Sequence, residues 1–293
     1  MKKRYLKWLF KHVSDIKGKT FVVTGATGSI GKAVTRYLSF KGASIIIAVR
    51  NRTKGNDLIN ELRKEFSNND YYLEIVDFSS IESTKCFVNN LSSYKIDYFI
   101  STAGVYHLPQ KITDDGMEIH YETNYYNQIK VIESLGKKLK YIIVSSLSHR
   151  YTKIDFENIM SLSVKNRTKV YARSKRLLNY HLVYLINQGF DIRITHPGVS
   201  PTSLFAVEKG GFGKLFSKLI FPLMKLVFHS PEKGALTVLY AIDNVPKYGK
   251  EIGPRGLFGV WGYPKVVSLP KALQKEEKQL MVIECYNLSK NDK

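Results

Sequence analysis

Residues 20–31 read TFVVTGATGSIG, an apolar, β-branched run followed by glycines at positions 25, 28 and 31. The run predicts a buried strand, and the residues after it predict a helix. Glycines between a strand and a helix permit a tight turn and let a pyrophosphate approach the backbone and the helix N-terminus. A purely structural turn is the alternative interpretation. The predicted nucleotide contacts here are Gly25, Thr27, Gly28, Ser29, Ile30 and Gly31.

Apolar runs alternate with helical patterns through the first two thirds of the chain. Strand-like runs lie at residues 20–24, 44–49, 72–76, 98–101, 141–145 and 191–195. Helical patterns lie near residues 30–41, 52–67, 80–92, 113–138 and 168–188. Continuous apolar strands with helices between them indicate a parallel sheet covered on both faces. With right-handed crossovers this becomes a doubly wound, Rossmann-type α/β fold.

The chain shows no internal repeat, low-complexity tract or Pro/Gly/Ser linker over its 293 residues, which predicts one domain over residues 17–293 after a basic segment at 1–16. The pattern changes within residues 204–229, where 214–228 read KLFSKLIFPLMKLVF. Three lysines fall in a narrow arc of a helical wheel and Pro222 interrupts it. We interpret this stretch as a helical lid over the substrate pocket, with core packing or a membrane-facing patch as alternatives.

Forty-five basic against 25 acidic residues give a net charge of +20. Such an excess favours solubility and attracts anions, including phosphate-bearing cofactors or an anionic membrane surface. The basic residues are scattered, without zinc-finger spacing or an aromatic RNA-binding signature, so no nucleic-acid partner is expected. Cys86 and Cys285 lie far apart and in no metal-ligand spacing. They indicate a reducing compartment, hence a cytoplasmic protein, with neither disulfide framework nor metal site.

Residues 1–12, MKKRYLKWLFKH, begin like a signal peptide but do not continue as one, because Lys7 and Lys11 interrupt the apolar run and no cleavage site follows. No window holds enough uninterrupted apolar residues to span a bilayer. One hypothesis is a short interfacial helix that makes the protein membrane-peripheral. The alternative is packing of this segment onto the protein body. The apolar residues concerned are Leu6, Trp8, Leu9 and Phe10.

The second strand-like run ends in arginine rather than in an acid. An NAD site usually places Asp or Glu at this strand end to bind the ribose hydroxyls, and here no acid appears before Asp57. Arg50, followed by Asn51, instead offers a fork suited to a 2′-phosphate. The sequence therefore predicts NADP(H) as cofactor, unless Arg50 and Arg52 are only solvated loop charges.

Residues 171–175 read YARSK, which places a tyrosine and a lysine one turn apart on a helix. A free tyrosine titrates near ~10, and a neighbouring ammonium favours its phenolate. We therefore expect Lys175 to lower the pKa of Tyr171, so that Tyr171 can exchange a proton near neutral pH. By itself the spacing also arises by chance.

Further segments follow the glycine turn in order: DFSS at 77–80, STAG at 101–104, ETN at 122–124, SSLSH at 145–149, HPGV at 196–199 and SPEKGA at 230–235. With the turn and the Tyr171–Lys175 pair, they make the chain resemble the short-chain dehydrogenase/reductase family, most closely its retinol-dehydrogenase-like branch, from about residue 17 to 262. The resemblance implies a catalytic tetrad of Asn124, Ser146, Tyr171 and Lys175. It also implies that SPEKGA starts a helix.

The resemblance assigns further cofactor contacts along the chain. They are Asp77 and Phe78 near the adenine, Ala103 and Gly104 at a strand end, and Pro197, Gly198, Val199 and Thr202 near the nicotinamide, with Tyr171 and Lys175 beside it. STAG stands where the family usually has Asn-Asn-Ala-Gly, so the usual strand-bracing by those two amides is not expected. Ser29 stands where members of this length usually carry glycine. The Gly28 spacing resembles that of longer, epimerase-like relatives, and we interpret it as local variation.

The function implied is hydride transfer between a nicotinamide and a carbonyl carbon of an apolar alcohol, aldehyde or ketone. Tyr171 transfers the proton, Lys175 holds the nicotinamide ribose, Ser146 binds the substrate oxygen, and Asn124 positions a relay water. Homodimers and homotetramers are common in the family. Alternatives are a nucleotide-binding regulator of the same fold and a peripheral membrane component. His149 and His181 are interpreted as surface or packing residues, and His196 as shaping its loop.

Overall fold

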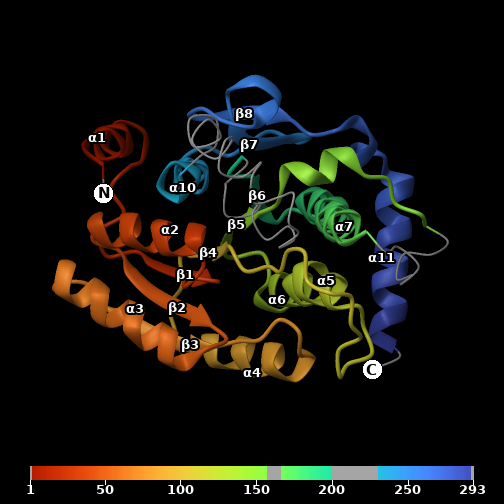
Figure 1. Cartoon of the computed structure of the whole chain (residues 1–293), viewed down its shortest axis with the longest axis horizontal. Helices are drawn as coiled ribbons and strands as arrows, with labels where there is room; N and C mark the ends of the chain where they lie inside the picture. The colour runs from red at the N-terminus through yellow and green to blue at the C-terminus, as the bar shows by residue number, and fades with distance from the viewer. Residues whose placement is uncertain (1, 157–165, 199–229, 292–293) are drawn as a thin grey trace, which may run out of the picture.

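The computed structural model describes residues 2–156, 166–198 and 230–291, which contain one sheet of eight strands (Figure 1). The strand order is β3-β2-β1-β4-β5-β6-β7-β8. Every neighbouring pair is parallel except β7 and β8. The strands are β1 (Thr20–Thr24), β2 (Ser44–Val49), β3 (Tyr71–Ile75), β4 (Tyr98–Ser101), β5 (Lys140–Val144), β6 (Asp191–Thr195), β7 (Lys250–Pro254) and β8 (Pro264–Ser268). The predicted doubly wound fold is confirmed.

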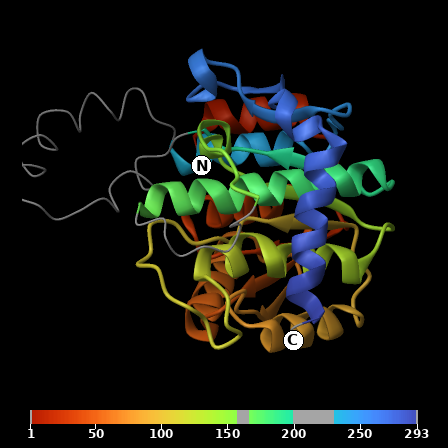
Figure 2. The same cartoon turned by 90° about the vertical axis from the view of Figure 1, so that its right-hand side faces the viewer.

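Helices cover both faces of this sheet (Figures 1 and 2). One face carries α2 (Ser29–Phe40), α3 (Arg52–Glu65) and α10 (Pro231–Tyr240), with α1 (Lys3–His12) outside α10. The other face carries α4 (Ile81–Leu91), α6 (Asn127–Leu135) and α7 (Arg167–Asn187). On this second face α11 (Glu276–Asn291) crosses α7 on the outside (Figure 2).

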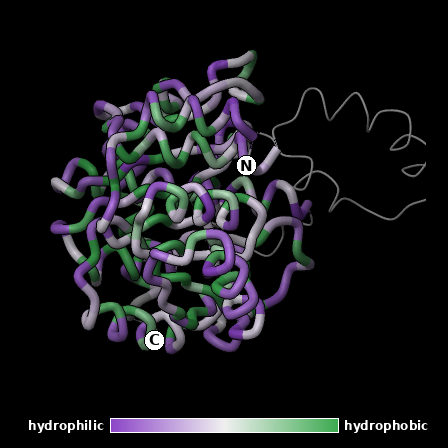
Figure 3. Tube along the Cα trace, turned by 90° about the vertical axis from the view of Figure 1, so that its left-hand side faces the viewer, coloured by the Kyte–Doolittle hydropathy of each residue, from purple (hydrophilic) through white to green (hydrophobic). Residues whose placement is uncertain are grey.

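The core consists of two apolar layers, one on each face of the sheet. Successive residues of a strand point to opposite faces, so Phe21 and Val23 of β1 join the layer under α2, while Val22 joins the layer under α7. Residues on both sides of each strand are apolar because both faces are covered. Along the helices of the α2 side, hydrophobic and hydrophilic residues alternate (Figure 3), as expected for helices with one buried face.

The order of the strands fixes where a ligand can bind. From β1 the chain builds outward through β2 and β3, and it then returns to the other side of β1 with β4. At such a reversal the loops leave the sheet in opposite directions, and a crevice opens at the carboxyl ends of the strands. The glycine turn follows β1 and the STAG segment follows β4 at this edge.

Most predicted elements agree with the structure to within two residues, but the helix predicted near 113–138 is wrong in its first part. Residues 113–118 form turns, and a short helix α5 (Ile119–Tyr121) leads into a π-helical turn η1 (Glu122–Tyr126) before α6. The SPEKGA prediction is confirmed, since Ser230 caps α10 by accepting from the Lys233 amide and Pro231 occupies its first turn.

Three elements near the C-terminus were not predicted. β7 carries the breakers Gly253 and Pro254, and β8 begins with a proline, so neither is an uninterrupted β-branched run. Each forms because it pairs with a neighbour, β7 with β6 and β8 with β7. α11 is anchored by Val282 and Tyr286, which are buried against the α7 side of the core.

The basic N-terminal segment packs onto the domain. Tyr5 and Leu9 of α1 are 2% and 0% exposed, and the Trp8 ring stacks on His12 and on Tyr263 with centroid distances of 4.5 and 5.8 Å. Phe10, at 64% exposure, is the apolar residue of this helix that faces outward. The structure therefore favours packing over the interfacial-helix hypothesis for most of the segment. No helix in the described ranges is long and apolar enough to cross a membrane.

The predicted substrate lid, 204–229, lies outside the described residues, as do the predicted cofactor contacts Val199 and Thr202. The described chain ends at Gly198 in the loop after β6 and resumes at Ser230 before α10. The lid and these two contacts stay predictions.

Candidate active site

Two glycine positions of the turn after β1, Gly25 and Gly31, have no room for a side chain. Gly25 has φ 66°, and a Cβ built there would lie 2.7 Å from the Ala103 backbone. A Cβ on Gly31 would lie 2.3 Å from the Gly25 carbonyl oxygen. Gly28 precedes α2 without a side-chain cap, so the first amides of α2 are not covered by a capping side chain. At this turn a phosphate could approach the backbone closely and meet the partial positive charge at the N-terminus of α2.

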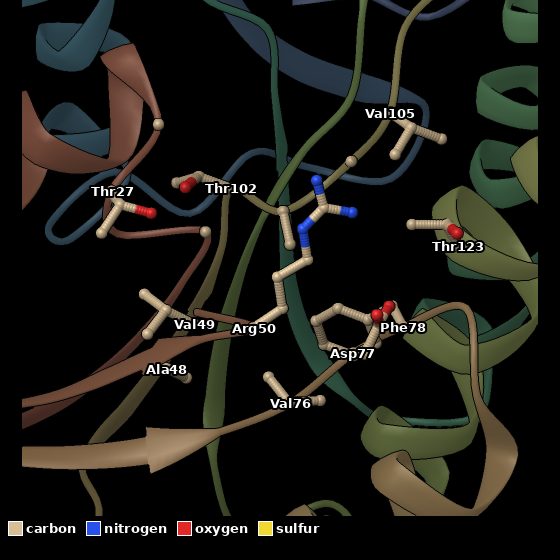
Figure 4. Close-up of a pocket in the computed structure, with 14 residues that line it drawn as sticks. Thr27, Ala48, Val49, Arg50, Val76, Asp77, Phe78, Thr102, Val105 and Thr123 are labelled. Carbon is tan, nitrogen blue, oxygen red and sulfur yellow. The ribbon is translucent and has the colours of Figure 1, made fainter. Parts of the chain in front are cut away.

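A cavity of about 270 Å³ lies beside this turn at the ends of β1, β2, β3 and β4. Arg50 extends from the end of β2 into it, and Asp77 and Phe78 line it from the segment after β3 (Figure 4). The Asp77 carboxylate accepts from the Ser79 amide and hydroxyl at 2.9 and 2.7 Å, which fixes its orientation. The cavity also includes Gly25, Thr27, Gly28, Ala103 and Gly104.

Asn51 has a structural role at the start of α3, and its predicted cofactor contact stays a prediction. Its side chain caps α3 by accepting a hydrogen bond from the Lys54 amide at 2.9 Å. Asn51 does not line the cavity, whereas its neighbour Arg50 does. The local sequence explains this result, because an asparagine directly before a helix is a preferred N-cap.

Hydroxyl groups brace the end of β4 where the family's two amides are absent. Thr102 donates its hydroxyl to the Thr24 carbonyl at 2.6 Å, and the Ala103 amide donates to the Thr24 hydroxyl at 3.4 Å. Ser101 donates to Gln128 Oε1 at 2.5 Å and so ties β4 to α6. The STAG substitution therefore keeps the link between β1 and β4 with different side chains.

A second cavity, of about 420 Å³, contains the predicted catalytic groups Ser146, Tyr171 and Lys175. Ser29 and Ile30 of the glycine turn and Pro197 and Gly198 after β6 line the same cavity. The two cavities share Thr102, Ala103, Gly104 and Val105 at the end of β4, so they adjoin one another. Together they form one path along the carboxyl edge of the sheet, from Arg50 to Tyr171.

Tyr171 and Lys175 lie on α7, one turn apart, but their electrostatics differ from the prediction. Desolvation raises the pKa of Tyr171 to about 12, against a hydrogen bond with Ser146 that lowers it. Burial lowers the pKa of Lys175 to about 8, and its Nζ donates to the Val144 carbonyl at 3.1 Å. In the chain alone the pKa of Tyr171 is therefore raised and not lowered as expected, because burial dominates it and Lys175 is not among the groups that shift it.

Ser146 accepts two hydrogen bonds at its hydroxyl oxygen. The Ser148 amide and hydroxyl donate to Ser146 Oγ at 3.3 and 2.9 Å, and this pair opens the short 3₁₀ helix η2 (Leu147–Tyr151). With its oxygen occupied in this way, the Ser146 proton is left to point toward Tyr171 or a substrate oxygen.

Asn124 lies in the π-helical turn η1, behind the cavity rather than on its wall. Its amide accepts from the Val105 amide at 2.7 Å, and it donates to the Val105 carbonyl at 2.9 Å and to Ser174 Oγ at 3.0 Å. A Cβ on Gly104 would lie 3.0 Å from Asn124 Oδ1 and 3.5 Å from Lys175 Nζ, so these groups converge on Gly104. The side chain of Asn124 thus holds the loop after β4 in place.

Several residues of the second cavity were not predicted. Tyr106 meets the Tyr171 ring edge-on at 4.8 Å, and Tyr151 and Thr168 line the cavity beside it. Ser148 could have been found from its spacing, two residues after Ser146 in SSLSH. The others carry no local pattern. The three histidines discussed above are buried, so His149 and His181 are packing residues and not surface residues.

The chain matches the model of the NAD dependent epimerase/dehydratase family over residues 21–203. Retinol dehydrogenase 13 of Mus musculus is 31% identical over 251 residues, which cover 79% of this chain and 75% of the relative. Polyprenol dehydrogenase of Homo sapiens is 30% identical over 240 residues, which cover 75% of this chain and 71% of the relative. A solved structure, L-sorbose reductase from Gluconobacter frateurii with NADPH and L-sorbose, covers 79% of this chain and 95% of its own with a TM-score of 0.58 and 19% identity.

The matched family model covers the glycine turn, including Gly28 and Ser29. The curated relatives that match about three quarters of the chain are dehydrogenases. The chain therefore belongs to the short-chain dehydrogenase/reductase family of oxidoreductases, in its retinol-dehydrogenase-like branch.

Proposed function

We propose that this protein is an NADP(H)-dependent oxidoreductase that interconverts an apolar alcohol and its carbonyl compound by hydride transfer. One observation carries the proposal: Ser146, Tyr171 and Lys175 line a single cavity together with residues of the glycine turn and of the loop after β6. Proton-transfer groups and a nucleotide cradle thus face the same space. General acid–base chemistry on a carbonyl requires this arrangement.

The residues present fit a dinucleotide. Gly25 and Gly31 place no side chain at the turn that a pyrophosphate would approach. Both positions require glycine, because a Cβ atom there would collide with backbone atoms. The cavities on either side of Gly104 adjoin, which suits a ligand with an adenine at one end and a nicotinamide at the other. Asp77 and Phe78 would hold the adenine end, and Pro197 and Gly198 the nicotinamide end.

Arg50 supports NADP(H) over NAD(H). It reaches into the first cavity from the strand end where an acid would bind the ribose hydroxyls of NAD (Figure 4). A guanidinium pairs well with a phosphate and poorly with hydroxyls alone. The similar L-sorbose reductase was solved with NADPH, which agrees with this choice.

An apolar substrate is favoured by the wall of the second cavity and by the relatives. Ile30, Val105, Tyr106 and Leu147 line the cavity around the polar groups of Ser146 and Tyr171. The two curated relatives are named for retinol and for polyprenol, both long apolar alcohols. We infer a lipophilic alcohol, aldehyde or ketone and assign no single compound.

In this mechanism bound NADP(H) supplies or accepts the hydride. Tyr171 donates its phenolic proton to the carbonyl oxygen during reduction and removes it from the alcohol during oxidation. Ser146 donates a hydrogen bond to the same oxygen and stabilises the charge that develops there. Lys175, whose pKa burial lowers to about 8, lies one turn from Tyr171 on α7 and would hold the nicotinamide ribose hydroxyls when the cofactor is bound. Asn124 keeps the loop after β4 in place around these groups.

The test is NADPH consumption, followed by absorbance, with hexanal, decanal and farnesal as probes. We expect turnover that increases with the apolar length of the aldehyde and a preference for NADPH over NADH. NADPH binding without turnover of any aldehyde or of the matching alcohols would favour the alternative, a nucleotide-binding regulator. No NADPH binding at all would contradict both.

A further inference from the structure

The short helix that presents Ser146 rests on a buried carboxylate. Ser146 begins η2, and the residues that follow, His149 and Arg150, both turn toward Glu251 on β7. His149 Nε2 lies 3.4 Å from Glu251 Oε2, and Arg150 donates to Glu251 Oε1. Arg150 also donates to the Ser268 carbonyl on β8 at 2.7 Å. These contacts therefore link η2 to β7 and β8, the last two strands of the sheet.

Glu251 is ionised although it is fully buried. Burial by itself would raise the pKa of its carboxyl, but the interaction with His149 and the charges of His196 and Arg150 outweigh burial and lower the pKa to about 2. A buried carboxylate is retained only where it is paired, because an unpaired charge is costly in the interior. Its partners are concentrated on η2, within four residues of Ser146.

The opposite side of η2 is held by the helix that carries the proton-transfer pair. Arg176, next to Lys175 on α7, donates to the His149 carbonyl at 2.8 Å. The ring of His149 thus lies beside the Glu251 carboxylate, and its backbone carbonyl accepts a hydrogen bond from Arg176. These contacts form a short path from Glu251 to the helix that carries Tyr171.

The loop after β6 interacts electrostatically with the same carboxylate. His196, which precedes Pro197 and Gly198, interacts electrostatically with Glu251. A Cβ on Gly253 of β7 would lie 2.1 Å from His196 Nε2, so the imidazole packs directly on this strand. Both segments that flank the second cavity, η2 and the loop after β6, are therefore braced by β7.

We propose that Glu251 is a positioning residue for Ser146: its carboxylate holds η2, through His149 and Arg150, in the place where the Ser146 hydroxyl can reach the substrate oxygen. The inference rests on the proposed oxidoreductase function. Glu251 itself does not line the second cavity.

The first test is a double-mutant cycle on kcat, with NADPH and whichever of hexanal, decanal and farnesal the wild type reduces fastest. Glu251→Gln keeps the shape and removes the charge, and we expect kcat to fall about tenfold with KM for NADPH unchanged. In a Ser146→Ala background the same change should lower kcat by less than about twofold, because the group that Glu251 positions is already gone. Equal losses in both backgrounds would overturn the inference.

The matched control is Glu74→Gln. Glu74 is also a buried carboxylate, accepting from Asn90 and Tyr94 at 3.0 and 2.9 Å, but it lies on β3 away from η2. We expect it to lower stability without changing kcat. A tenfold loss of kcat in this control would show that loss of stability by itself lowers turnover.

A second readout does not depend on activity. Hydrogen–deuterium exchange of NADPH-bound protein should become faster in Glu251→Gln across peptides of residues 146–151 and stay unchanged across β1. If the wild type reduces no aldehyde, the proposed function fails while this measurement still decides the positioning role. Unchanged exchange in residues 146–151 would overturn that role even in an active enzyme.

Discussion

The two adjoining cavities are built in different ways. The first, around Arg50, is lined mainly by residues at the carboxyl ends of β1, β2, β3 and β4 or just after them, and its shape depends on glycine backbone. The second, around Tyr171, is assembled from η2, α7 and the loop after β6, and it is supported from behind by Glu251 on β7. The first is a consequence of strand order. The second depends on side-chain contacts between distant segments.

The charged side chains Arg50 and Lys175, one from each cavity, differ in their exposure to solvent. Arg50 is exposed, whereas Lys175 is buried at 4% exposure. Charges near water are screened, and buried charges shift their pKa instead. Substitutions in the first cavity should therefore change cofactor affinity and little else, whereas those in the second should change turnover and pH dependence.

The largest effect is expected for Tyr171→Phe. The variant keeps the ring that packs against Tyr106 but loses the proton donor, so kcat should fall about a thousandfold while the Kd for NADPH changes by less than about twofold. The measurement pairs aldehyde reduction with fluorescence titration of NADPH. Tyr106→Phe is the matched control and should retain most activity. Undiminished turnover in Tyr171→Phe would remove this residue from the proposed mechanism.

A pH-dependent stability follows from Lys175. Burial lowers its pKa from 10.5 to about 8, so between these values the unfolded chain binds a proton that the folded chain has released. The free energy of unfolding should therefore rise by about 3 kcal/mol as the pH increases through this window, and the charged lysine destabilises the fold below it. Lys175→Met should lack this rise.

Urea unfolding of the wild type and Lys175→Met across the same pH window tests this prediction. The difference between the two proteins isolates Lys175, because the tyrosines titrate in both. The same pH dependence in the two proteins would mean that Lys175 is not desolvated. Arg50→Ala, in the exposed cavity, should retain the wild-type pH dependence.

Arg50→Ala should weaken NADPH by about thirtyfold and NADH by less than about twofold, because only NADPH carries the 2′-phosphate that the guanidinium would bind. Isothermal titration with both cofactors measures the ratio. Arg52→Ala, at the exposed start of α3 and outside the cavity, serves as the control. An equal loss for both cofactors would leave the 2′-phosphate assignment without support.

The smallest effect is expected for Ser148→Ala. Losing one neutral hydrogen bond to Ser146 Oγ should lower kcat by about fivefold and leave cofactor affinity unchanged. The backbone amide of residue 148 still donates to the same oxygen, which limits the loss. If NADPH affinity falls instead of kcat, the separation between the two cavities is incorrect.

Much of the first cavity could be predicted from the sequence because each of its parts is local. The glycines come directly after β1, Arg50 comes directly after β2, and the segment DFSS comes shortly after β3. Asn51 is the exception. Its position beside Arg50 predicts a cofactor contact, and the structure shows in addition that its side chain caps α3.

Less of the second cavity could be predicted, because its shape and the pKa values of its side chains depend on burial and on contacts between segments distant in the chain. The Tyr171–Lys175 spacing was visible, yet the expected lowering of the tyrosine pKa was wrong, since desolvation depends on what surrounds α7. Glu251 lies more than a hundred residues after Ser146 in a strand with no β-branched pattern. No local signal connects the two.

The sequence by itself determined the alternation of strands and helices, the glycine turn and the order of the polar motifs, because each depends on neighbouring residues. Only the tertiary structure decided which motifs share a cavity, which side chain lines it and which one caps a helix, and which charges are desolvated. These outcomes depend on the packing of segments that are distant in the chain, and local periodicity carries no information about that packing.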